Sequence, residues 1–110
     1  MTDNHAAKYA FQQYAIRGFE APTDKEGQID HTAVVITLAV LEGYGKSRCV
    51  EVVRYVLFHE PESLDHRGEV NRRIVRFSTR RHVSIPTAYR WLSEAYDLYA
   101  MTREAIVCAI

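Results

Sequence analysis

The chain has 110 residues, a mass of 12.7 kDa and a formal net charge of zero, a size that suits one domain with a single core. Hydrophobic residues make up 47% and charged residues 25%, which excludes a disordered chain and a membrane protein. The longest apolar stretch, residues 33–41, is about half of the roughly 20 residues that span a bilayer, and residues 1–20 lack the pattern of a signal peptide. We expect a cytoplasmic protein without a membrane partner.

Apolar residues recur at helical spacing along the chain, and no segment alternates long enough to predict a strand. The predicted fold class is therefore all-α, a compact bundle of about five helices. The first helix is expected over residues 5–18, with Phe11 and Tyr14 on its apolar face and Gly18 at its end. Residues 19–28 contain Pro, Asp and Gly without periodicity, which predicts a loop.

The second helix is expected to begin after Asp30 as its N-cap and to end at the Gly-Tyr-Gly run of residues 43–45. Its predicted core face is formed by four residues: Val34, Val35, Leu38 and Leu41. Ser47 is the predicted N-cap of a third helix over residues 48–58, which Pro61 prevents from continuing. The β-branched residues of this segment also permit a strand, but its length favours a helix.

Residues 60–68 predict a polar connection, after which Val70, Ile74 and Phe77 define a fourth helix with arginines on its other faces. A fifth helix is expected over residues 85–100, and residues 103–110 either extend it or form a short tail helix. Within one domain, residues 1–62 form an N-terminal helical part that is expected to contact a polymerase or a second copy of the chain. Residues 63–102 form the part expected to bind DNA.

The cysteines, histidines and acidic residues show no sequence pattern of an active site or a metal site. Cys49 and Cys108 lie far apart without a CxxC motif, which excludes a zinc site and predicts two buried, reduced thiols. The five histidines are scattered, and the acidic residues of the 60–68 connection lack the spacing of a calcium loop. No phosphate loop, HExxH motif or nucleophile elbow is present. We therefore expect no enzyme, no cofactor and no metal.

The zero net charge conceals a strong segregation of charge. Residues 67–90 hold seven arginines and one acid, Glu69, so the rest of the chain carries a net charge of −6. This window contains no lysine, and arginine is the residue that makes planar, bidentate contacts to phosphate and guanine. The window is therefore the predicted site for an anionic partner.

Residues 82–92, His-Val-Ser-Ile-Pro-Thr-Ala-Tyr-Arg-Trp-Leu, resemble the second half of a helix-turn-helix motif. Ser84 is the predicted N-cap and Pro86 falls in the first turn of the helix. Ala88, Trp91 and Leu92 are expected to face the preceding helix. His82 departs from the motif, which usually has Gly here because the turn residue tends to adopt positive φ. A non-Gly residue with positive φ is uncommon, although histidine is among the better tolerated, so we expect a turn that is slightly different or strained.

The motif predicts binding of double-stranded DNA, with the start of the fifth helix in the major groove. Tyr89 and Arg90 are the first candidates for contact with bases or backbone, followed by Ser84 and Thr87. The complete set of predicted DNA-binding residues is Arg72, Arg73, Arg76, Arg80, Arg81, Ser84, Ile85, Pro86, Thr87, Tyr89 and Arg90.

The order of elements adds a wider resemblance. An N-terminal aromatic helix (Tyr-Ala-Phe-Gln-Gln-Tyr, residues 9–14), an acidic and apolar middle and a C-terminal helix-turn-helix ending in Tyr-Arg-Trp-Leu resemble the phage Q-type transcription antitermination proteins and their small bacterial relatives. The resemblance implies a protein that binds DNA near a promoter, engages paused RNA polymerase and its sigma factor, and causes read-through of terminators. Some members carry a zinc insertion, for which this chain lacks the cysteines.

Two alternatives remain open at this point. A conventional helix-turn-helix activator or repressor makes the same first contact with DNA, and many such regulators bind as homodimers. A protein-interaction module would use the basic face to bind an acidic partner instead.

Overall fold

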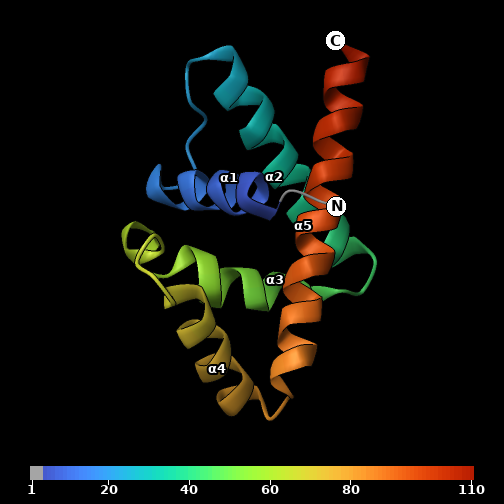
Figure 1. Ribbon diagram of the computed structural model, residues 1–110. Helices are drawn as coiled ribbons and strands as arrows, with labels where there is room; N and C mark the ends of the chain where they lie inside the picture. Colours follow the sequence, from blue (N-terminus) through green and yellow to red (C-terminus); the bar gives the residue numbers. More distant parts are fainter. Residues whose placement is uncertain (1–3) are drawn as a thin grey trace.

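The computed structural model describes residues 4–110, whose backbone forms helices and connecting turns without a strand (Figure 1). The expected all-α bundle of five helices is confirmed. The elements in chain order are α1 (Asn4–Ile16), α2 (Lys25–Gly43), α3 (Ser47–Val53), the π-helical η1 (Arg54–Phe58), the 3-10 turn η2 (Pro61–Ser63), α4 (Glu69–Arg81) and α5 (Ile85–Ala109).

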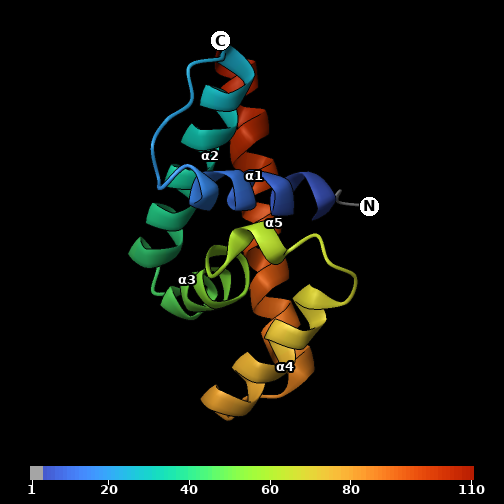
Figure 2. The same ribbon diagram turned by 90° about the vertical axis from the view of Figure 1, so that its left-hand side faces the viewer.

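The 25-residue helix α5 is the element around which the others pack. It runs the length of the molecule, with α2 along its C-terminal half and α4 beside its N-terminal half (Figures 1 and 2). The core is apolar, and its largest fully buried side chains include Phe11, Phe77 and Leu57. Residues 103–110 extend the predicted fifth helix as far as Ala109 and form no separate tail helix. None of the helices in the described part of the chain is long and apolar enough to cross a membrane.

The start of α2 corrects two sequence predictions. Its N-cap is Asp24, whose carboxylate accepts a hydrogen bond of 2.7 Å from the backbone N–H of Gly27, so part of the predicted loop is helical. A Cβ at Gly27 would lie 2.7 Å from an oxygen of that carboxylate, which explains a glycine inside the first turn. Asp30 lies within the helix and instead accepts hydrogen bonds from Arg103 and Tyr99 of α5.

The buried face of α2 also differs from the predicted one. Val34 and Leu41 are buried as expected, but they share the core face with Thr37 and Ala33, whereas Val35 is 43% exposed. Successive residues are separated by about 100° around a helix, so Val35 lies about 200° from the buried Ala33 and points away from the core. The Thr37 hydroxyl is satisfied inside the core because it donates to the Ala33 carbonyl at 2.6 Å.

The helix predicted over residues 48–58 is present, so the strand alternative is wrong. Ser47 is its first residue, and the N-cap Lys46 makes no side-chain cap bond, so the predicted Ser47 cap is also wrong. The last turns are π-helical, and the backbone leaves the helix at His59 before Pro61, as expected. Cys49 is buried, but Cys108 near the end of α5 is exposed, because this end of the helix extends beyond the core.

Candidate nucleic-acid interface

The connection between α4 and α5 is a three-residue turn held by Ser78. His82 adopts the left-handed conformation that a glycine usually takes at this position of the motif, with φ 55° and ψ 42°. The carbonyl of Ser78 accepts a hydrogen bond of 3.1 Å from the backbone N–H of Val83, and the Ser78 hydroxyl donates to the Val83 carbonyl. One buried serine therefore fixes the turn through both its backbone and its side chain.

Ser84 begins α5 as the sequence predicts. Its hydroxyl oxygen accepts a hydrogen bond of 3.1 Å from the backbone N–H of Thr87, and it lies 2.8 Å from the Thr87 hydroxyl. Pro86 lies in the first turn, where its missing N–H removes no helical hydrogen bond. The start of the helix is thus defined by local bonds alone.

The inner side of α5 packs against α4 through Ala88 and Leu92, both buried. Trp91 is half-buried, with its ring edge-on to Phe77 at a centroid distance of 6.3 Å. The Arg48 guanidinium lies 5.7 Å from the centroid of the Trp91 ring, in the position of a cation–π contact. Trp91 therefore covers the core and presents no free ring to a nucleic acid.

The outer side of the first turns of α5 is formed by Ile85, Pro86 and Arg90, all exposed. Tyr89 is half-buried, and its hydroxyl donates to Asn71 Oδ1 on α4 at 2.7 Å. This bond joins the two helices and occupies the hydroxyl that was predicted to contact DNA. Among these residues only Arg90 brings a charge to the exposed surface.

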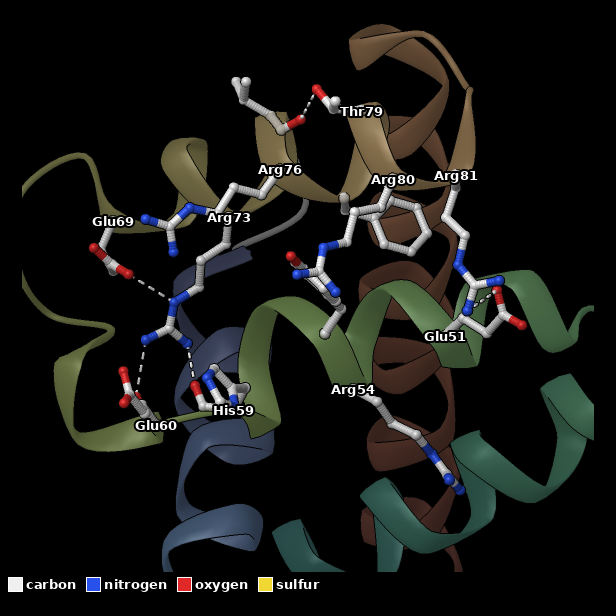
Figure 3. Close-up of a pocket in the computed structure, with 13 residues that line it drawn as sticks. Glu51, Arg54, His59, Glu60, Glu69, Arg73, Arg76, Thr79, Arg80 and Arg81 are labelled. Carbon is white, nitrogen blue, oxygen red and sulfur yellow. Dashed lines mark hydrogen bonds and ion pairs between the residues drawn. The ribbon is translucent and has the colours of Figure 1, made fainter.

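Arg73 was predicted to contact phosphate, but this prediction is wrong because its side chain is buried inside the protein. Only 3% of the residue is exposed. Its guanidinium donates to the backbone carbonyls of Val56 (2.9 Å), His59 and Glu60 (2.9 Å), and to the Glu69 carboxylate at 2.8 Å. Arg73 therefore ties α4 to the end of η1 (Figure 3).

The other arginines of α4 are exposed. Arg72 pairs with Glu69 at 3.3 Å on the outer surface. Arg76, Arg80 and Arg81 line a groove of about 970 Å³. Arg80 and Arg81 extend toward α3 and η1, whereas Arg76 runs along α4 toward Glu69 (Figure 3). The predicted arginines thus do not form one surface with Arg90.

The charged residues within the segment itself all have the same sign. Residues 70–93 contain six arginines and no acidic residue. Glu69, at the first position of α4, is held by Arg73, whose hydrogen bond lowers the pKa of the Glu69 carboxyl, and the positive charge of Arg72 adds to this effect. Glu69 therefore stays ionised and engaged with its two arginines.

Sequence reasoning missed the residues of other helices that face this region. Asn71 carries no motif signal, and Arg48, Glu51 and Tyr55 of α3 and η1 approach α4 and α5 only in the folded chain. Their contacts span long stretches of sequence, so no local spacing predicts them.

No protein-family model, curated protein or solved structure gives a significant match to this chain. Within residues 4–110, no three His, Cys, Asp or Glu side chains come together in an arrangement that could hold a metal ion.

Proposed function

We propose that the chain is a DNA-binding transcription regulator in which α4 and α5 act as a helix-turn-helix. The observation that carries this proposal is the short turn at His82, followed by the Ser84 cap and an exposed helix start in a segment without acidic residues. Helix-turn-helix proteins place the start of their second helix in the major groove in this manner.

Arg90 is the proposed base-reading residue. It is exposed on α5 near the start of the helix, and an arginine in the major groove can donate two hydrogen bonds to O6 and N7 of guanine. Ile85 and Pro86 add an apolar edge that suits a thymine methyl group. Arg72, on the outer surface of α4, is placed to approach the phosphate backbone.

The resemblance to Q-type proteins extends the proposal from DNA binding to antitermination. In this proposal the regulator loads onto RNA polymerase near a promoter and causes read-through of terminators. Residues 1–62 would then face the polymerase and its sigma factor, or a second copy of the chain. Support for this step comes from the order of elements in the sequence, whereas support for DNA binding also comes from the turn and the cap.

The first experiment selects a binding site from a random duplex library and measures the affinity of wild type and Arg90→Ala for it. The matched control is Arg54→Gln, because the Arg54 guanidinium points away from α4 (Figure 3). We expect a selected sequence, with weaker binding for Arg90→Ala and unchanged binding for Arg54→Gln. Failure to enrich any duplex would contradict DNA reading.

The second experiment is transcription in vitro from a promoter that carries the selected site, with a terminator downstream. Initiation and read-through are scored separately. An increased read-through fraction at constant initiation supports antitermination. A change in initiation alone identifies a conventional activator or repressor and contradicts the antitermination step.

A further inference from the structure

The groove beside α4 is a second basic surface, separate from the exposed start of α5. It lies between α4 on one side and α3 with η1 on the other, whereas the hydrogen bond from Tyr89 to Asn71 marks the side of α4 that meets α5. Arg80 and Arg81 of α4 extend into it from above in Figure 3, and Arg76 lies along its α4 edge. Its volume of about 970 Å³ makes it large enough for an extended ligand.

The charges in this groove are incompletely neutralised. Arg81 pairs with Glu51 at 3.4 Å, and Glu69 is engaged by Arg72 and Arg73. Arg80 forms no ion pair within residues 4–110, and Arg76 acts on Glu69 only through its charge. The groove is also lined by Glu60. Two exposed guanidinium groups one helical turn apart are therefore available to an anionic ligand.

An aromatic ring completes the surface. The Arg80 guanidinium lies 6.0 Å from the centroid of the Tyr55 ring. The Tyr55 ring is edge-on to the buried Phe77 ring, at 5.7 Å between centroids, and this contact fixes the orientation of the Tyr55 ring. A fixed ring beside a planar guanidinium is a surface on which a nucleobase can stack.

The aromatic ring favours a single strand over a duplex. The walls of the groove are joined by the bonds from Arg73 to the carbonyls of Val56 and Glu60. The bases of a double helix are stacked on one another, whereas an unpaired base has a free face that can stack on an aromatic side chain.

We propose that this groove binds single-stranded nucleic acid, with phosphates on Arg76 and Arg80 and a base stacked on the Arg80–Tyr55 pair. Basic grooves with aromatic side chains are the general means by which proteins hold single strands. An acidic peptide would match the charge but would make no use of the flat ring beside Arg80. The inference does not depend on the reading of duplex DNA by α5.

The test measures binding of a fluorescent oligo(dT) of about 12 nucleotides by anisotropy, with the full chain and over a series of salt concentrations. We expect binding that weakens with salt, with a slope of about −0.7 for each phosphate contacted. The double variant Arg76→Gln/Arg80→Gln should lose at least about tenfold in affinity, since it removes two phosphate contacts. Arg17→Gln is the matched control, because Arg17 is exposed after the end of α1 and does not line the groove, and it should bind as wild type does.

A second variant and two competitors distinguish a stacked single strand from an acidic peptide or a duplex backbone in the groove. Arg80→Lys keeps the charge but loses the planar group, so a several-fold loss supports stacking. The inference is overturned if the protein does not bind oligo(dT). It is also overturned if poly-glutamate displaces the labelled oligo(dT) as effectively as unlabelled oligo(dT) does, because this result would identify an acidic protein ligand. Loss of duplex binding but not of oligo(dT) binding in the double variant would assign the groove to duplex backbone and also overturn it. Arg90→Ala should leave oligo(dT) binding unchanged, because Arg90 lies outside the groove. A failure to bind duplex DNA through α5 can therefore be distinguished from a failure to bind a single strand in the groove.

Discussion

The guanidinium of Arg73 on α4 holds the backbone carbonyl of Val56 within η1, with 2.9 Å between Nη1 and the carbonyl oxygen. The carbonyls of His59 and Glu60 share the same side chain. Carbonyls at the end of a helix lack partners within the helix, so an arginine from another element satisfies those that close η1. The basic segment is thus fastened to the rest of the bundle by one of its own charges.

Replacing Arg73 with Met should lower the free energy of unfolding by about 3 kcal/mol, because three backbone carbonyls lose a charged donor. Urea unfolding followed by circular dichroism measures this difference. Arg72→Met is the control, since Arg72 is exposed and should change stability by about 0.5 kcal/mol or less. Equal stability of the two variants, together with a smaller salt dependence of DNA binding for Arg73→Met, would restore Arg73 to the phosphate-binding set.

Replacing His82 with Gly should raise the free energy of unfolding by about 1 kcal/mol, because a side chain at φ 55° is strained and glycine is not. His82→Val should lower it, since a β-branched residue tolerates this conformation least. Equilibrium unfolding in urea compares the three proteins. A less stable glycine variant would mean that the histidine side chain, and not the backbone alone, holds the turn.

Replacing Arg90 with Ala should weaken binding to the selected duplex by about 1–3 kcal/mol if Arg90 reads a guanine. Binding to unrelated duplexes should change little, so the ratio of specific to non-specific affinity falls. Titrations against both kinds of duplex at one salt concentration measure the ratio. An equal loss for all sequences would instead assign Arg90 to the phosphate backbone.

The two cysteines should differ strongly in reactivity. Burial raises the pKa of the Cys49 thiol to about 11, and its hydrogen bond to Glu94, at 3.3 Å, acts in the same direction. A thiol reagent at pH 8 should modify the exposed Cys108 quickly and Cys49 only after unfolding. Two fast thiols in the folded protein would contradict the burial of Cys49.

The same pKa shift predicts a loss of stability in alkali. The unfolded thiol ionises near its ordinary pKa of 9.0, whereas the folded thiol keeps its proton until about pH 11. The folded state therefore binds more protons in this interval, and the free energy of unfolding falls as the pH rises from about 9 to 11. Cys49→Ala should lack this component in urea titrations over the same range.

The sequence predicted those features that depend on neighbouring residues. The helix ends at Gly18 and at the Gly-Tyr-Gly run, and the Ser84 cap, were recognised because each is a local signal of backbone geometry. Asp24 and Asp30 are equally good caps by type, and only the fold shows that Asp30 bonds to α5 instead. The choice between them could not be made locally.

The burial of Arg73 could not be predicted for a different reason. With Glu69 four residues earlier, it has the spacing of an ordinary ion pair on a solvated helix face. Its other partners are backbone atoms of η1 and the turn after it, which no side-chain pattern reveals. The same holds for the groove, since Tyr55 and Arg80 meet only through the packing of α4 on η1.

Helix α5 is continuous over 25 residues, so at 1.5 Å for each residue it is a rod of about 37 Å. Its first turns carry Arg90, and its far end is tied to α2 by the bonds of Arg103 to Asp30 and Glu26. A tilt of about 5° in such a rod shifts one end by about 3 Å relative to the other. That shift is about the length of a hydrogen bond, so a change in the contacts between α2 and the end of α5 that tilted the helix would be large enough to break a bond made by Arg90.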